Sequence, residues 1–168
     1  SGKTKTGKYN FLNPVAQEKG VDPLPDYKEP DKDLIPDKKY PFIFGNFRIF
    51  THEHSSTFSN YQLMKMVNSN SLWINTLDAQ KLGIKEGDRV KVKSPWGSVE
   101  MKAYPTWEIM RGVLASGGGF GHIRGLEGDP KYPEFGGANA PGIQKPNYTE
   151  QIGGTPLLKF IKTTVEKI

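Results

Sequence analysis

The polar side chains best suited to ligand chemistry lie between residues 48 and 57. This stretch contains Arg48, His52, His54, Ser55 and Thr57. Arginine and hydroxyl groups suit a pyrophosphate, because a guanidinium donates two parallel hydrogen bonds to phosphate oxygens. A neutral histidine can hydrogen-bond a ring or a phosphate oxygen. The cluster therefore favours an anionic ligand. A solvated loop is one alternative, and a His-x-His metal site, without cysteine or a carboxylate at helical spacing, is a weaker one.

A second candidate loop is the glycine-rich stretch 117–121, which His122 follows. Glycine adopts positive φ without strain, and such backbone can aim successive N–H groups at an anion. The stretch matches neither the Walker A motif nor the Gly-x-Gly-x-x-Gly fingerprint, and a plain turn is the alternative. We predict that Gly121 and His122 contact the same ligand as the first loop.

Three further polar residues are candidates for binding. Asn75 and Asp78 could bind a ligand, but their spacing is typical of helix capping, which we favour. Asn147 is a candidate for a last contact near the end of the chain.

The sequence offers no catalytic residue and no metal site. It has no cysteine, which excludes disulfides, thiolate catalysis and cysteine ligation of an iron–sulfur cluster or molybdenum by these residues. No Ser/His/Asp spacing indicates an activated nucleophile. The net charge of +5 favours anionic partners. Because the lysines are spread without a basic stripe, we expect no nucleic-acid partner, and no apolar run is long enough for direct membrane insertion.

The elements that must position these residues are short strands. Apolar runs and alternation predict strands over 40–44, 71–75, 89–93, 98–103, 112–115 and from 157 to 161 and Val165, with short helices over 61–67 and 76–82. Residues 1–39 are proline-rich and polar, as in a linker or arm, and residues 40–168 form the domain. The chain starts at Ser1 rather than Met, which favours a fragment. Many short strands with long loops predict a closed β-barrel.

The central part of the chain resembles a known family. The resemblance is carried by the unit Ile74-Asn75-x-x-Asp78-Ala79-x-x-Leu82-Gly83-Ile84-x-x-Gly87-Asp88-x-Val90-x-Val92-x-Ser94-x-x-Gly97. This unit looks like the signature of the molybdopterin-dinucleotide-binding domain that ends the catalytic subunits of the dimethyl-sulfoxide-reductase family. The flanking loops follow in the family's order, and the linker is similar to that of thiosulfate and polysulfide reductases.

The resemblance implies a mainly β fold, a double-psi β-barrel of the aspartate-decarboxylase-like type with short helices and long loops. It implies that the ten candidates above hold bis(molybdopterin guanine dinucleotide) with molybdenum or tungsten in the full enzyme, and that the isolated domain is inactive. It also implies several partners on the periplasmic or extracytoplasmic side: the upstream domains, an iron–sulfur subunit for electron transfer, and a membrane anchor subunit. The alternative function is a stand-alone double-psi barrel that recognises a protein partner; a barrel that binds nucleic acid is a third possibility.

Overall fold

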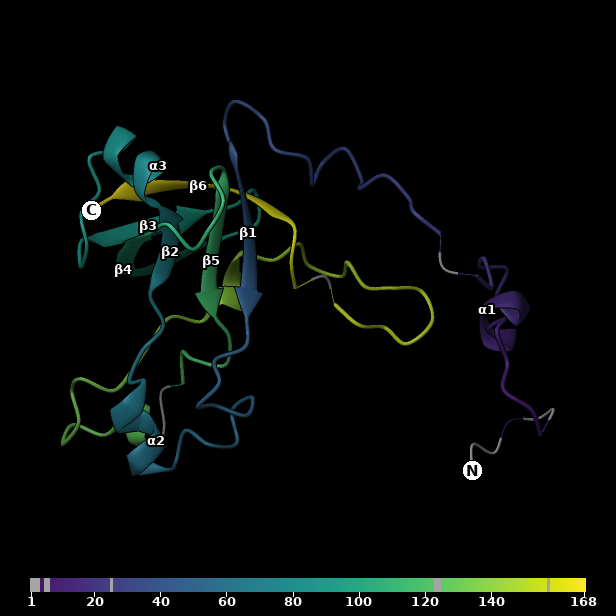
Figure 1. Cartoon of the computed structure of the whole chain (residues 1–168), viewed down its shortest axis with the longest axis horizontal. Coiled ribbons are helices and arrows are strands. Elements are labelled where there is room, and N and C mark those ends of the chain that lie inside the picture. The colour runs from purple at the N-terminus through teal and green to yellow at the C-terminus, as the bar shows by residue number, and fades with distance from the viewer. Residues whose placement is uncertain (1–3, 5–6, 25, 123–124, 157) are drawn as a thin grey trace.

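Six strands close into a barrel in the computed structural model, which describes residues 4, 7–24, 26–122, 125–156 and 158–168 (Figure 1). The strand order around the barrel is β1-β5-β2-β4-β3-β6. The strands are β1 (Phe42–Phe47), β2 (Leu72–Asn75), β3 (Arg89–Lys93), β4 (Ser98–Thr106), β5 (Val113–Gly117) and β6 (Ile161–Lys167). The helices are short: α1 (Pro14–Glu18), α2 (Tyr61–Met66), α3 (Thr76–Lys81), η1 (Gly125–Gly128) and η2 (Ala140–Ile143). The predicted mainly β barrel with short helices and long loops is confirmed.

Strand direction decides which loops meet. β1 and β5 are parallel, with Phe47 opposite Gly117, so both strands end at the same edge of the barrel. β2 is antiparallel to β5, so it ends at the opposite edge, at Asn75. The loop after β1 and the glycine-rich loop after β5 therefore leave the barrel together, as Figure 1 shows, while α3 lies at the other edge.

The barrel interior is filled by alternate side chains of the strands. In β3 the alternation predicted from the sequence places Val90 and Val92 inside, both fully buried. Each such side chain contributes roughly 1.5–3 kcal/mol through burial. The interior side chains from the other strands include Phe44, Leu72, Ile74, Leu114, Ile161 and Val165.

Several strand boundaries differ from the prediction, and β5 runs two residues further than predicted, to Gly117. β1 continues through Gly45 and Asn46, because it pairs with β5 as far as Phe47. β4 continues to Thr106, because its last residues pair in parallel with β2. The last strand begins at Ile161 rather than 157: Phe160 has a φ of 63°, a left-handed conformation that does not continue a strand, and Leu157 lies outside the described residues.

A second apolar cluster lies under the loops at the edge of the barrel where β1 and β5 end. Its buried members are Phe58, Met64, Phe120 and Phe135. Each comes from a different segment: the loop after β1, helix α2, the glycine-rich loop and the segment after η1. The ring centroids of Phe58 and Phe120 are 4.6 Å apart in an edge-to-face arrangement. This cluster fixes the two candidate loops against each other.

The N-terminal arm runs away from the barrel and carries α1 at its far end (Figure 1). Its residues next to the barrel are attached. Lys145 Nζ is 2.6 Å from Asp33, Lys162 Nζ is 2.9 Å from Asp37, and Leu34 is only 2% exposed. The boundary between residues 39 and 40 stays a prediction. No helix in the described part of the chain is long and apolar enough to cross a membrane.

Candidate functional site

A pocket with a volume of about 510 Å³ opens at the edge where β1 and β5 end. The loop after β1 forms one wall and the glycine-rich loop forms another, with residues 139–141 and 158–159 completing it. Its size is within the range of small-molecule sites. The polar lining residues are Asn46, Arg48, His52, His54, Ser55, His122, Asn139 and Lys159.

The pocket brings together five of the ten predicted site residues. Four come from the first loop, and His122 comes from the second. Among the described residues, the lining includes the cations Arg48 and Lys159 and no aspartate or glutamate. A concave surface with cations, amides and histidines but no carboxylate attracts an anion.

Arg48 and His54 lie together at the open side of the pocket. The Arg48 guanidinium Nη2 lies 3.2 Å from His54 Nε2 and can donate a hydrogen bond to it. The carboxylate of Glu53 lies 3.6 Å from both side chains. Arg48 is 75% exposed and His54 71%, so these contacts are weak surface interactions and both groups remain accessible to a ligand.

His52 and Thr57 instead hold the loop in shape. The backbone N–H of Glu53 donates to Thr57 Oγ1, and the Thr57 hydroxyl lies 3.1 Å from His52 Nδ1. His52 Nε2 lies 2.9 Å from the carbonyl of Val67, which can only accept, so Nε2 carries the proton and Nδ1 accepts from Thr57. The His52 ring is 7% exposed and stacks on Phe58. A cofactor contact by either side chain stays a prediction.

The two loops approach each other so closely that side chains are excluded between them. Gly119 has a φ of 94°, and a Cβ atom there would lie 2.8 Å from the His54 carbonyl oxygen. Gly121 has a φ of 98°, and a Cβ there would lie 2.5 Å from the backbone nitrogen of Asn139. Glycine is therefore required at both positions for the pocket to close.

Asn75 and Asp78 lie at the opposite edge of the barrel and do not line this pocket. The Asn75 side chain accepts from the Leu77 N–H at the start of α3, as the capping interpretation predicts, and donates to the Ile109 carbonyl. The buried Asp78 carboxylate accepts from the Gly112 N–H over 2.7 Å and pairs with Arg111. These contacts support the connection before β5.

Asn147 is also outside the pocket. It is exposed, has a φ of 58°, and lies in the segment that Lys145 joins to the arm. Gly121 borders the site through its close approach to Asn139, without lining the pocket itself.

Three polar lining residues were not predicted from the sequence: Asn46, Asn139 and Lys159. Asn46 was not singled out because it follows the apolar run that predicted the first strand. Lys159 fell inside the predicted last strand; in the structure it lies against Gly45 of β1. Asn139 lies in an irregular segment, positioned through buried Asn70, which accepts from the Ala138 N–H and donates to the carbonyls of Gly117 and Ala138. No periodic pattern in the sequence predicts that Asn46, Lys159 or Asn139 lines the pocket.

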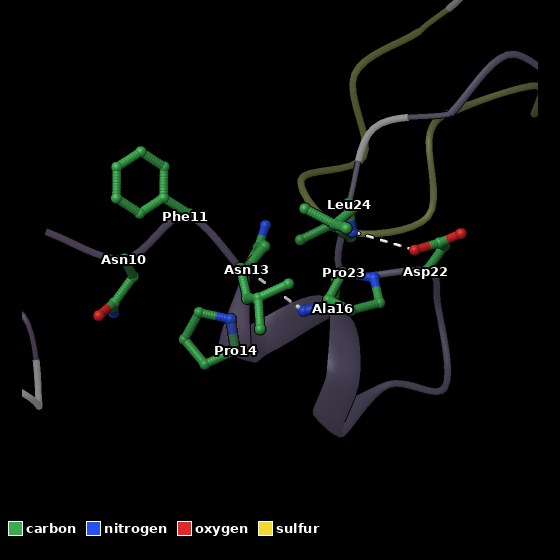
Figure 2. Close-up of a pocket in the computed structure, with 10 residues that line it drawn as sticks. Asn10, Phe11, Asn13, Pro14, Ala16, Asp22, Pro23 and Leu24 are labelled. Carbon is green, nitrogen blue, oxygen red and sulfur yellow. Dashed lines mark hydrogen bonds between the residues drawn. The ribbon is translucent and has the colours of Figure 1, made fainter.

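Another pocket, of about 500 Å³, lies between the arm and Ile152, and Figure 2 shows residues that line it. Its polar side chains serve the local fold: Asn13 caps α1 at Val15, and Asp22 accepts from the Leu24 N–H. No lysine, arginine or histidine is among the described residues that line it. In the described part of the chain, no group of three or more histidine and carboxylate side chains is placed to hold a metal ion.

The closed barrel with a polar pocket between two loops is an arrangement typical of a ligand-binding domain. Comparison with protein families gives the same class: the family described as "Molydopterin dinucleotide binding domain" matches residues 42–159. The chain belongs to this family, whose ligand is a molybdopterin-type dinucleotide. The family match gives no support to the alternative of a stand-alone partner-recognition module.

The chain is also similar to curated relatives, and its fold is similar to that of a solved structure. The chain is 38% identical over 102 residues, 59% of its length, to dimethyl sulfoxide reductase DmsA of Escherichia coli, and 33% identical over 122 residues, 68% of its length, to putative dimethyl sulfoxide reductase chain YnfE of the same organism. These matches span only 12% and 14% of those proteins. Acetylene hydratase from Pelobacter acetylenicus has the same fold, with a TM-score of 0.74 at 20% identity, over 98% of this chain and 24% of the hydratase chain.

Proposed function

We propose that the pocket binds the guanine form of a molybdopterin dinucleotide, and that the chain is the C-terminal cofactor domain of a larger oxidoreductase that uses molybdenum or tungsten. The observation that carries the proposal is the composition of the pocket. Two loops converge there, and the lining residues that the structure describes include two cations, three histidines and two amides but no carboxylate.

The residues present fit such a ligand. Arg48 and Lys159 lie on different segments of the wall and would neutralise a pyrophosphate between them. Gly118 and Gly119 allow the main chain to approach a phosphate, since neither carries a side chain into the pocket. Asn46 and Asn139 each present a donor and an acceptor, which is the chemistry needed to hydrogen-bond a guanine edge.

The bound metal and pterin supply the redox chemistry, and this domain binds and orients them. Among the described residues, no group of three or more histidine and carboxylate side chains could hold a metal ion. The isolated chain is therefore expected to show no turnover with acceptor dyes. Robust turnover by this polypeptide alone would contradict the proposal that the domain only binds and orients the cofactor.

The proposed parent enzyme is a reductase of sulfur compounds such as thiosulfate or polysulfide. A relative supports this branch: the chain is 34% identical to a tetrathionate reductase of Archaeoglobus fulgidus over 97 residues, 56% of this chain and 8% of that protein. The proposed partners are the upstream domains of the same polypeptide, an iron–sulfur subunit for electron transfer, and a membrane anchor subunit. The proposed location is the periplasmic or extracytoplasmic face of the membrane.

The proposal is tested by calorimetric titration of the chain with GDP, which carries the guanine and pyrophosphate of the cofactor. Arg48→Ala and Lys159→Ala should each weaken binding about tenfold, because each removes a charged hydrogen-bonding partner of the pyrophosphate. The matched control is Arg89→Ala, since Arg89 lies on β3 and pairs with Glu100 outside the pocket. Binding that is unchanged in both pocket variants, or equally weakened in the control, would contradict the assignment.

A further inference from the structure

The glycine-rich loop is held by a carboxylate that the pocket does not contain. Glu127, in η1, accepts two hydrogen bonds from successive backbone groups: the Gly121 N–H donates to Oε1 and the His122 N–H to Oε2, both over 3.2 Å. Hydrogen bonds to an ionised acceptor are stronger than neutral ones, and a bidentate pair also fixes orientation.

Glu127 is not itself a lining residue, whereas His122 is. The Glu127 carboxylate therefore binds the main chain of the loop, while the side chain of His122 lines the pocket. The opposite constraint is Asn139, whose backbone approaches Gly121 so closely that a Cβ atom would not fit. The Gly121–His122 segment thus lies between the Glu127 carboxylate and the Asn139 main chain.

The segment that carries Glu127 is anchored. Its neighbour Leu126 packs against the cluster of Phe58, Met64, Phe120 and Phe135. The His122 ring also contacts this cluster, with its centroid 5.5 Å from that of Phe58. Because packed apolar contacts resist displacement, the packing of Leu126 holds the neighbouring Glu127 carboxylate in place. The carboxylate in turn restricts the position of the loop main chain that it binds.

We infer that Glu127 is a positioning residue for the nucleotide pocket: its carboxylate orients the Gly121–His122 main chain so that His122 faces the ligand. This inference rests on the proposed function, since it assigns Glu127 a role in the same pocket. It predicts that Glu127 affects ligand affinity only when the His122 side chain is present.

The experiment combines amide exchange with GDP titration of the whole chain. In Glu127→Ala the exchange rates of the Gly121 and His122 amides, followed by NMR, should rise about tenfold, and the Kd for GDP should rise severalfold. Glu127→Gln keeps one carbonyl acceptor and should fall between Glu127→Ala and the unchanged protein. The control is Glu134→Gln, which alters an exposed carboxylate in the same segment, with no hydrogen bond or ion pair to the described residues, and should change neither quantity.

A double-mutant cycle separates positioning from general support of the fold. In a His122→Ala background, Glu127→Ala should have no further effect on the Kd for GDP. An equal effect in both backgrounds, unchanged affinity in Glu127→Ala, or tighter binding in that variant would each overturn the inference. If the unchanged protein fails to bind GDP, the proposed function falls and the inference falls with it; normal binding with an unchanged Glu127→Ala refutes the inference alone. Should Glu127→Ala fail to fold, Glu127→Gln carries the same comparison.

Discussion

The main chain of Gly119 lies directly against the carbonyl group of His54, with no room for a side chain between them. A Cβ atom on Gly119 would lie 2.8 Å from that oxygen. The two residues are far apart in the sequence, and the parallel pairing of β1 with β5 brings their loops to one edge. This contact closes the wall of the proposed cofactor pocket.

Replacing Gly119 should therefore destabilise the domain. Gly119→Ala must accommodate both the close contact and a φ of 94°, so we expect a loss of about 1–3 kcal/mol in the free energy of unfolding, measured by urea denaturation. Gly142→Ala is the matched control, since a Cβ there meets nothing within 4 Å, and should change stability by less than about 0.5 kcal/mol. Equal losses in the two variants would refute the contact as the cause.

The hydroxyl of Thr57 should contribute more to the free energy of unfolding than its methyl group does. Thr57→Val leaves the Glu53 N–H and His52 Nδ1 without their partner, and we expect a cost of about 1–3 kcal/mol in the free energy of unfolding. Thr57→Ser keeps the hydroxyl and should retain most of the stability. The ¹⁵N shifts of the His52 ring report the tautomer, and a proton found on Nδ1 rather than Nε2 would contradict the bonding described here.

Asp78 does not take the capping role predicted for it, because its carboxylate binds Arg111 and the Gly112 N–H instead, and its replacement tests guanine recognition. Asp78→Ala removes the acceptor of the Gly112 N–H, and should lower the free energy of unfolding by about 1–3 kcal/mol. Because the residue lies at the far edge of the barrel, the Kd for GDP should not change under conditions where the variant is folded. A weakened affinity in the folded variant would instead favour guanine recognition by Asp78.

Attachment of the arm should weaken in acid. The hydrogen bond from Lys162, together with the backbone N–H groups of Tyr40 and Lys39, lowers the pKa of Asp37 below its ordinary value of 3.8. A lowered carboxyl pKa stabilises the folded form above the ordinary value and loses this contribution as the pH falls through the lowered pKa. Between about pH 4 and pH 2, limited proteolysis by pepsin should therefore cut the arm increasingly fast. Asp37→Asn should make cleavage less dependent on pH, and an identical profile for both proteins would count against the ion pair.

Much of the barrel follows from local sequence pattern. Strict alternation predicted β3 with its buried valines, and the Asn75 cap predicted the start of α3. Strand ends were less predictable, because β1 and β4 extend as far as their parallel partners allow, and that pairing joins residues distant in the sequence. The site shows the same division. The loop containing Arg48 and His54 was found from its composition, whereas Lys159 and Asn139 reach the pocket only through the closure of the barrel.

The most direct test of the central claim is an NMR titration of the ¹⁵N-labelled chain with GDP, following every backbone amide. We predict that the largest shifts fall on Asn46, Ser55, Gly118, Gly119 and Lys159 around one pocket, while Asn75 and Asp78 remain unchanged. Shifts centred on α3 or on the arm pocket near Leu24, or no shifts at millimolar GDP, would contradict it.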